Sequence, residues 1–291
     1  MRINSYHEVL AMIKLLVDSS ADLSAEALAR MGAVSVPLGV TIQGGDYLDG
    51  VDLSRDRFYE MLTDASEFPK TTMPSPAAFV EHFERAKNSG DQLICILLSS
   101  ALSGTYQSAV TAKAMVDYDG IFIVDSLAAA SCIRILAEHA ERLITDGHTA
   151  GEIVLSLEQL KGRVHVYAAL DTLEYLYKGG RLSRAAAAVG TIANLKPIVT
   201  FDGNGSVVVC KKSLSRARAR TDLMEIIRSK NIDPAFPVYS LYTSGTENVE
   251  YLEQQIADAG INLTERTQIG PAIGSHVGPG VYGLFIVERE S

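Results

Sequence analysis

The stretch QLICILLSSALSGTYQSA (residues 92–109) holds the pattern from which the fold class can be predicted. It opens with a nearly continuous apolar run, which is typical of a strand buried on both faces of a parallel sheet. Small and polar residues follow, and helix-compatible residues begin at about Gly104. The stretch therefore predicts a strand, a polar turn and a helix, the unit from which α/β proteins are built.

The same alternation continues on both sides of this stretch. Residues 74–90 predict a helix with Ser75 as N-cap, Pro76 at the first helical position and Gly90 after the last turn. Further buried strands are expected over 13–20 and 121–126, and further helices over 24–31, capped by Ser24, and over 127–145. This rhythm favours a mostly parallel sheet with helices on both faces.

The pattern changes at about Val164. Residues 196–213, KPIVTFDGNGSVVVCKKS, predict two strands joined by a turn rich in Asn and Gly. Helices and strands follow up to a last strand near the C-terminus. The sequence thus predicts an α/β protein of two domains, an N-terminal parallel-sheet domain over 1–163 and a C-terminal mixed α+β domain over 164–291.

Composition and charge exclude several classes of function. The net charge of −9 disfavours a nucleic-acid partner, because contacts with phosphates need a surplus of Lys and Arg. No apolar run approaches the ~18 residues of a transmembrane segment, and the N-terminus lacks the apolar region of a signal peptide, which predicts a cytoplasmic protein. The three cysteines are far apart and no Cys or His pair has metal-ligand spacing, so no metal site is expected.

Polar residues gather where predicted strands end and helices begin. KTTMPSP (70–76) and the serine-rich turn after residue 98 both lie at such places. In open α/β sheets ligands bind at the carboxyl ends of strands, and helix N-termini hold anions. These residues predict an anion site lined by the hydroxyl groups of Ser99, Ser100, Ser103 and Thr105. The alternative is that these residues only cap helices and shape turns.

A third cluster, GPAIGSHVGPGVYG (270–283), places one histidine, His276, among glycines and two prolines. This composition predicts irregular backbone rather than a regular helix. Taken alone, His276 is interpreted as a core histidine whose hydrogen bonds are satisfied, because a single histidine specifies no function. An acyl-ester hydrolase that uses Ser103 with His276 is one alternative function, although the chain has no G-x-S-x-G elbow. A phosphotransferase is another, although no phosphate-binding glycine loop is present.

Taken in order, these clusters resemble the sequence motifs of the DegV family, and the resemblance covers nearly the whole chain. Each segment is a modest match, whereas the ordered set is highly specific. The segments are VDSSADL (17–23), KTTMPSP (70–76), SSALSGTYQSA (99–109), IVDS (123–126), DTLEYLYKGGRLS (171–183), LKPIV (195–199) and IGSHVGPGVYG (273–283).

The resemblance implies a binding protein rather than an enzyme. DegV proteins bury one long-chain fatty acid between two domains, with no other cofactor and no metal. They present its carboxyl group to an ATP-dependent fatty-acid kinase, whose acyl phosphate product feeds phospholipid synthesis. The partners implied are therefore the fatty acid, the kinase and, transiently, a membrane surface.

The family motifs also imply which residues hold the carboxyl group of the fatty acid. These are Thr72, with Thr71 adjacent, Ser103 and His276. The supporting positions implied by the same motifs are Ser99, Gly104, Thr105 and Gly278.

Overall fold

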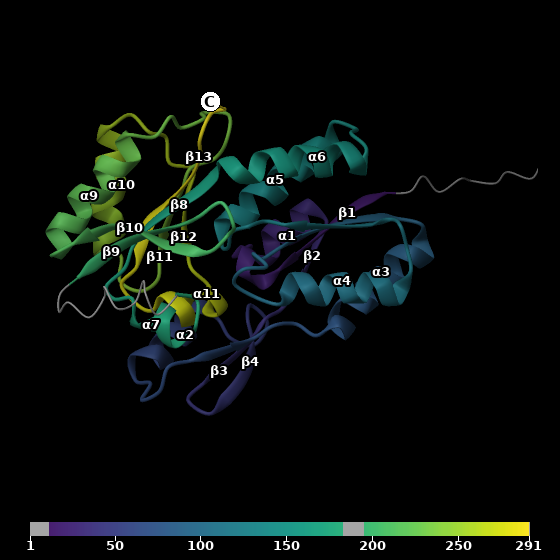
Figure 1. Ribbon diagram of the computed structural model, residues 1–291, viewed down its shortest axis with the longest axis horizontal. Coiled ribbons are helices and arrows are strands. Elements are labelled where there is room, and N and C mark those ends of the chain that lie inside the picture. Colours follow the sequence, from purple (N-terminus) through teal and green to yellow (C-terminus); the bar gives the residue numbers. More distant parts are fainter. Residues whose placement is uncertain (1–11, 183–194, 291) are drawn as a thin grey trace, which may run out of the picture.

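A computed structural model describes residues 12–182 and 195–290. Residues 1–11, in which no signal peptide is predicted, lie outside the described residues, as does the last residue of the DegV-like segment 171–183. The N-terminal half is built on a four-stranded parallel sheet in the order β2-β1-β6-β7 (Figure 1). Its strands are β1 (Ile13–Asp18), β2 (Ala33–Val36), β6 (Gln92–Leu97) and β7 (Ile121–Asp125).

Helices cover both faces of this parallel sheet, as the sequence predicts. Cys95 and Leu97 of β6 pack on Phe79 and Phe83 of one helical layer, whereas the alternate residues of β6 face the other layer. The first layer is α3 (Pro76–Ser89) and α4 (Thr105–Val116), and the second is α5 (Ser131–Thr145) and α6 (Ala150–Leu160).

The predicted helix ends are largely confirmed. Ser24 caps α1 (Ala25–Met31) by accepting the Ala27 N–H, and Gly90 ends α3 in the left-handed conformation. The helix expected from residue 127 begins only at Ser131. Leu127 and Ala130 have φ angles of 52° and 57°, so the backbone between β7 and α5 is a loop.

A small antiparallel sheet in the order β4-β3-β5 lies beside the parallel sheet. It consists of β3 (Gly39–Ile42), β4 (Gly45–Leu48) and β5 (Lys70–Thr72), and α2 (Arg55–Thr63) lies between β4 and β5 in the chain. β5 pairs with β3 so that Thr71 stands opposite Val40 and Thr72 opposite Gly39. This sheet therefore fixes the position of the two threonines that the sequence singles out.

The C-terminal half is a six-stranded sheet in the order β10-β9-β8-β13-β11-β12, in which only β11 and β12 are parallel. The predicted hairpin of β9 and β10 is present. The strands are β8 (Val164–Ala169), β9 (Lys196–Phe201), β10 (Val207–Ser213), β11 (Tyr239–Tyr242), β12 (Glu265–Gln268) and β13 (Tyr282–Val287).

The two faces of this second sheet have different partners. The outer face packs on α9 (Arg216–Arg228) and α10 (Glu247–Asp258), through residues such as Tyr167 and Leu284. The inner face contributes Val166 and Phe285 to the same apolar cluster as the N-terminal sheet. The short helices α7 (Glu174–Lys178) and α11 (Pro271–Val277) lie in the middle of the molecule, near α2 (Figure 1).

The predicted fold class is confirmed: a parallel-sheet α/β unit is followed by a mixed α+β unit. The change of sheet falls between β7 and β8. The exact domain limits, 1–163 and 164–291, stay a prediction.

The prediction of irregular backbone over residues 270–283 is wrong, because residues 271–277 form the helix α11. Pro271 occupies the first helical position, where no N–H is needed. Gly274 lies in the interior of α11, and a Cβ there would come within 2.6 Å of the Tyr59 hydroxyl and 2.8 Å of the Phe58 ring. The glycine therefore allows close packing of α11 on α2 rather than breaking the helix.

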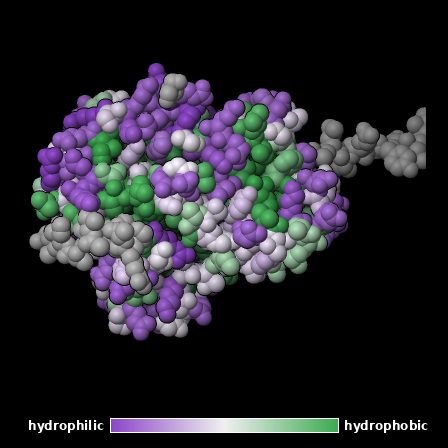
Figure 2. Space-filling model, viewed as in Figure 1, coloured by the Kyte–Doolittle hydropathy of each residue, from purple (hydrophilic) through white to green (hydrophobic). Residues whose placement is uncertain are grey.

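The face of the molecule in Figure 2 carries mostly hydrophilic residues at its rim, with smaller hydrophobic patches between them. Within residues 12–182 and 195–290, no helix has the length and apolar character needed to cross a membrane.

Candidate functional site

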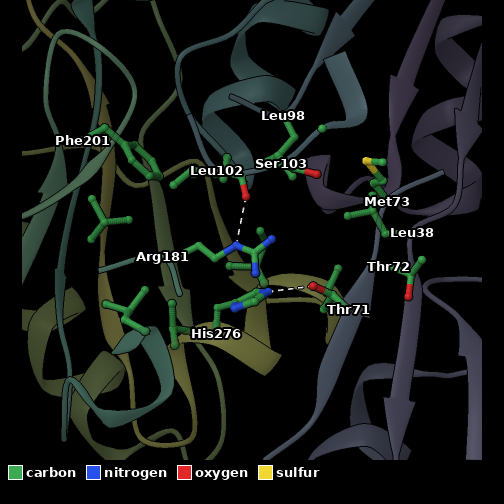
Figure 3. Close-up of a pocket in the computed structure, with 17 residues that line it drawn as sticks. Leu38, Thr71, Thr72, Met73, Leu98, Leu102, Ser103, Arg181, Phe201 and His276 are labelled. Atoms are coloured by element: carbon green, nitrogen blue, oxygen red, sulfur yellow. Dashed lines mark hydrogen bonds between the residues drawn. The ribbon is translucent and has the colours of Figure 1, made fainter. Parts of the chain in front are cut away.

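A cavity of about 330 Å³ lies where β5, the loop after β6, α7 and α11 meet (Figure 3). One end is polar and is formed by side chains of both halves of the chain. The polar lining residues are Thr71, Thr72, Ser103, Arg181 and His276, and the apolar ones are Leu38, Met73, Leu98, Leu102, Ala129, Leu176, Phe201, Val207, Ala272, Ile273 and Val277.

Thr71 and His276 meet across this cavity although they are 205 positions apart in the chain. The Thr71 hydroxyl and His276 Nε2 are 2.8 Å apart and form a hydrogen bond. Thr72 also lines the cavity, but it is exposed and its side chain lies farther from His276 in Figure 3. Neighbouring residues of a strand point to opposite faces, which explains why Thr71 makes the contact.

His276 is a neutral imidazole at physiological pH. Burial and, as the smaller cause, the positive charge of Arg181 together lower its pKa to about 4. Its Nδ1 atom is buried and has no hydrogen-bond partner among the described residues. Gly179 passes so close that a Cβ at this position would come within 2.2 Å of Nδ1. A glycine is therefore required beside the ring.

The loop after β6 brings Ser103 to the cavity. The Ser103 hydroxyl lies 2.8 Å from the Thr105 hydroxyl and accepts the Thr105 N–H at 3.3 Å. Gly104 lines the cavity too, and a Cβ there would come within 2.3 Å of the Met73 sulfur. Thr105 is fully buried behind this turn and does not line the cavity.

Like Thr105, two further residues proposed as supporting positions, Ser99 and Gly278, lie outside the cavity lining. Ser99 is fully buried and donates a hydrogen bond of 2.9 Å to the carbonyl of Gly205, in the turn between β9 and β10. Gly278 ends α11 with φ +77°, and a Cβ there would come within 2.4 Å of the Tyr175 ring. Both residues shape the backbone around the site.

Arg181 is the lining residue that the sequence analysis missed. Among the described residues that line the cavity it is the only one with a permanent charge. Its Nε donates to the carbonyl of Leu102 at 2.9 Å and its Nη1 to that of Gly179 at 2.5 Å. Arg181 lies in the segment DTLEYLYKGGRLS, which resembles a DegV motif. Nothing in the sequence, however, indicated that this arginine would lie beside Ser103 and His276.

The geometry suits a carboxylate better than it suits a nucleophile. In the described part of the chain no hydrogen bond joins Ser103 to His276, since Ser103 contacts Thr105 and His276 contacts Thr71. A nucleophilic serine needs a base within hydrogen-bond reach. Hydroxyl groups, a neutral imidazole and a guanidinium are instead suited to bind the two oxygens of a carboxylate.

An apolar cavity of about 60 Å³ continues the site between the two sheets. It shares Leu176, Phe201 and Ile273 with the first cavity and reaches Leu241 and Phe285 on the inner face of the second sheet. Thr200 is the one polar residue among the described residues that line this second cavity. The combined space is therefore polar at one end and lined mainly by hydrocarbon side chains at the other.

Comparisons with known proteins agree with this geometry. A family model described as an uncharacterised protein of the DegV family matches residues 12–289. A DegV domain-containing protein of Caldanaerobacter subterraneus is 35% identical over 279 residues, which cover 95% of this chain and 99% of the relative.

Solved structures with the same fold bind fatty acids. A fatty-acid-binding DegV family protein from Thermus thermophilus superposes with a TM-score of 0.86 at 29% identity, over 96% of this chain and 100% of its own. A stearic-acid-binding protein from Eubacterium ventriosum gives a TM-score of 0.84 at 27% identity, over 95% of this chain and 98% of its own.

Proposed function

The chain belongs to the DegV family, and from that premise we propose that it binds one long-chain fatty acid in the cavity beside Thr71, Ser103 and His276. The acid lies between the domains predicted over 1–163 and 164–291. The observation that carries this proposal is the form of the cavity, whose polar end continues into a space between the two sheets that is apolar except for Thr200.

The apolar part of the cavity accounts for the affinity. Burying the tail of a C16 to C18 acid at ~0.8 kcal/mol per methylene gives a gross gain on the order of 10 kcal/mol, before the cost of association. The tail lies among residues such as Leu176, Ile273 and Phe285.

The polar end holds the carboxyl group. An ionised carboxylate in a buried site is costly unless donors and a counter-charge surround it. The hydroxyls of Thr71, Thr72 and Ser103 and one N–H of His276 act as donors, and Arg181 supplies the positive charge. The neutral state of His276 leaves the net charge of the occupied site close to zero.

The protein acts as a carrier and not as a catalyst. It presents the bound carboxyl group to an ATP-dependent fatty-acid kinase in the cytoplasm, and the acyl phosphate product serves phospholipid synthesis. The exposure of Thr72 and Met73 at the polar end supports this role, because a partner can approach the carboxyl group from that side. The acid enters during transient contact with a membrane surface.

Mass spectrometry of the intact protein tests the proposal. We expect the purified wild type to carry one acyl chain of about 16 to 18 carbons, or to bind one equivalent of oleate when delipidated.

Ser103→Ala and His276→Ala should each weaken oleate binding about tenfold, because each removes a donor to the carboxylate. Ser100→Ala is the matched control, since Ser100 is an exposed serine of the same loop that does not line the cavity. A wild-type protein that neither carries nor takes up an acyl chain would refute the proposal.

A further inference from the structure

The turn at the end of β1 is hydrogen-bonded to two of the segments that carry polar residues of the site, the loop after β6 and α11. The turn comprises residues 18–22 and includes the short 3-10 helix η1 (Ser19–Ala21). Asp18 Oδ2 accepts the N–H of Leu98 at 2.6 Å, in the loop that leads to Ser103. Asp22 Oδ1 accepts the N–H of Gly270 at 2.8 Å, at the start of the helix that carries His276.

Asp22 is an unusual residue to bury in this place. Its side chain lines a second, polar cavity of about 490 Å³ together with Asp18, Asp49 and Arg55, yet only 4% of Asp22 is exposed. Its Oδ2 atom has no hydrogen-bond partner among the described residues. Burial raises the pKa of Asp22 to about 7, although Arg55 opposes the rise. The fold therefore keeps a carboxyl group where a carboxylate is costly.

These carboxyl groups do not form a metal site. In the described part of the chain no group of three or more His, Cys, Asp or Glu residues is arranged to hold a metal ion. Asp18 is already occupied by the N–H groups of Ser20 and Leu98, and Asp49 by the hydroxyl of Ser19. The one hydrogen bond that the Asp22 side chain makes among the described residues is the one it accepts from the N–H of Gly270.

The helix α11 depends on outside acceptors at its N-terminus. Its N-cap is Gly270, which has no side chain with which to cap the first turn. Asp22 accepts the Gly270 N–H, and Asp49 faces the N–H of Ala272, which opposes the rise in the pKa of Asp49 that burial causes. Both carboxyl groups belong to the N-terminal half, whereas α11 belongs to the C-terminal half.

The contact leaves no space between Asp22 and the backbone of Gly270. A Cβ at position 270 would come within 2.5 Å of Asp22 Oδ1. The φ angle of Gly270 is −73°, which any residue adopts, so the glycine is required by this contact and not by the backbone conformation. A shift of α11 would move His276, which lies on the same helix and meets Thr71 of the opposite half.

We propose that Asp22 is a positioning residue, which holds the start of α11 against the N-terminal half so that His276 meets Thr71 across the fatty-acid cavity. Its effect on ligand binding rests on the proposed function, whereas its effect on the environment of His276 does not.

The test follows His276 directly, by NMR titration of the histidines in the fatty-acid-free protein. In the wild type the pKa of His276 is about 4, because the ring is buried. Asp22→Ala removes the acceptor of Gly270, so we expect α11 to shift, water to reach the ring and the pKa to rise towards its ordinary value of about 6.5. Asp22→Asn keeps an oxygen at the Oδ1 position, and the pKa should stay near that of the wild type.

Asp91→Ala is the matched control. Asp91 is a buried aspartate of the same half that accepts the N–H of Met12. It precedes β6 and so lies at the amino end of that strand, whereas the site lies beyond the carboxyl end. It should lower stability without changing the titration of His276. If Asp22→Ala does not fold, Gly270→Ala perturbs the same contact from the other side and should raise the pKa of His276 in the same way.

Oleate binding by the same variants separates the two proposals. Asp22→Ala should bind oleate about tenfold more weakly than the wild type, and Asp22→Asn should bind it nearly as well. An unchanged His276 titration in both Asp22→Ala and Gly270→Ala would overturn the positioning role, whatever the wild type binds. A shifted titration in a protein whose wild type binds no oleate would support the positioning role and refute the fatty-acid site.

Discussion

At the scale of single residues, the character of the site depends on a histidine without charge. Burial is the larger cause of its low pKa and Arg181 the smaller one. Between pH 5 and 8 the imidazole therefore remains neutral, and it contributes one N–H donor and one acceptor. The positive charge in the cavity lining comes from Arg181 instead.

The substitution Arg181→Gln tests this division of roles. We expect the pKa of His276 to rise, because a nearby positive charge is removed, but to stay below about 6.5, because the ring remains buried. NMR titration of the histidines measures the shift. Arg216→Gln is the control, since Arg216 pairs with Asp171 and is not a lining residue of the cavity. A His276 pKa equal to that of the wild type would show that Arg181 exerts no charge effect on the ring.

At the scale of elements, the β9–β10 hairpin closes one side of the cavity. Phe201 and Val207, at the two ends of its turn, line the cavity. The turn is anchored on the N-terminal half, where the Ser99 hydroxyl donates to the Gly205 carbonyl. Gly205 has φ +78°, and a Cβ there would come within 2.2 Å of Ser99 Oγ and 2.8 Å of the Leu127 backbone.

Gly205→Ala should therefore lower the free energy of unfolding by about 3 kcal/mol, from backbone strain together with steric overlap. Urea denaturation measures this change. Gly203→Ala is the matched control in the same turn, because a Cβ at Gly203 meets no atom within 4 Å. Equal and small effects of the two substitutions would contradict the anchoring of the turn.

The elements also show what the sequence could predict. The caps of α1 and α3 and the hairpin turn are local patterns, and local patterns were sufficient for them. The helix α11 was not predictable in this way, because Gly274 is explained by Phe58 and Tyr59, more than 200 positions away in the chain. Arg181 joins the site for a similar reason, since its position depends on packing between distant segments.

At the scale of the whole molecule, the two halves share one interior. A single buried apolar cluster contains Ile94 of the parallel sheet and Phe285 of the second sheet. Arg134 of α5, which is buried, also bridges the halves. It pairs with Glu265 of β12 at 2.7 Å, and its guanidinium carbon lies 4.2 Å from the centre of the Tyr239 ring. We therefore expect the halves to unfold together rather than separately, and the buried charges between them to affect global stability.

The effect of a buried charge on global stability can be measured at Asp22. The pKa of Asp22 is about 7 in the folded protein and 3.8 in an ordinary exposed setting, so between these values the folded state binds more protons than the unfolded state. The contribution of Asp22 to stability is therefore lost as the pH rises through this window. Asp22→Asn removes the titration, and its stability relative to the wild type should rise between pH 5 and pH 8, on the order of 2 kcal/mol.

The comparison must be made as a difference between variant and wild type, since other groups titrate in the same range. His276 changes the pH dependence of stability in the opposite direction. Because its pKa is lowered, the folded state binds fewer protons than the unfolded state between about pH 4 and pH 6.5, so its contribution to stability rises with pH. This term is the same in both proteins and cancels. Urea denaturation at a series of pH values measures the difference. A difference that stays constant from pH 5 to pH 8 would mean that Asp22 is already ionised at pH 5. In that case an ionised carboxylate, and not a protonated carboxyl group, accepts the Gly270 N–H at the start of α11.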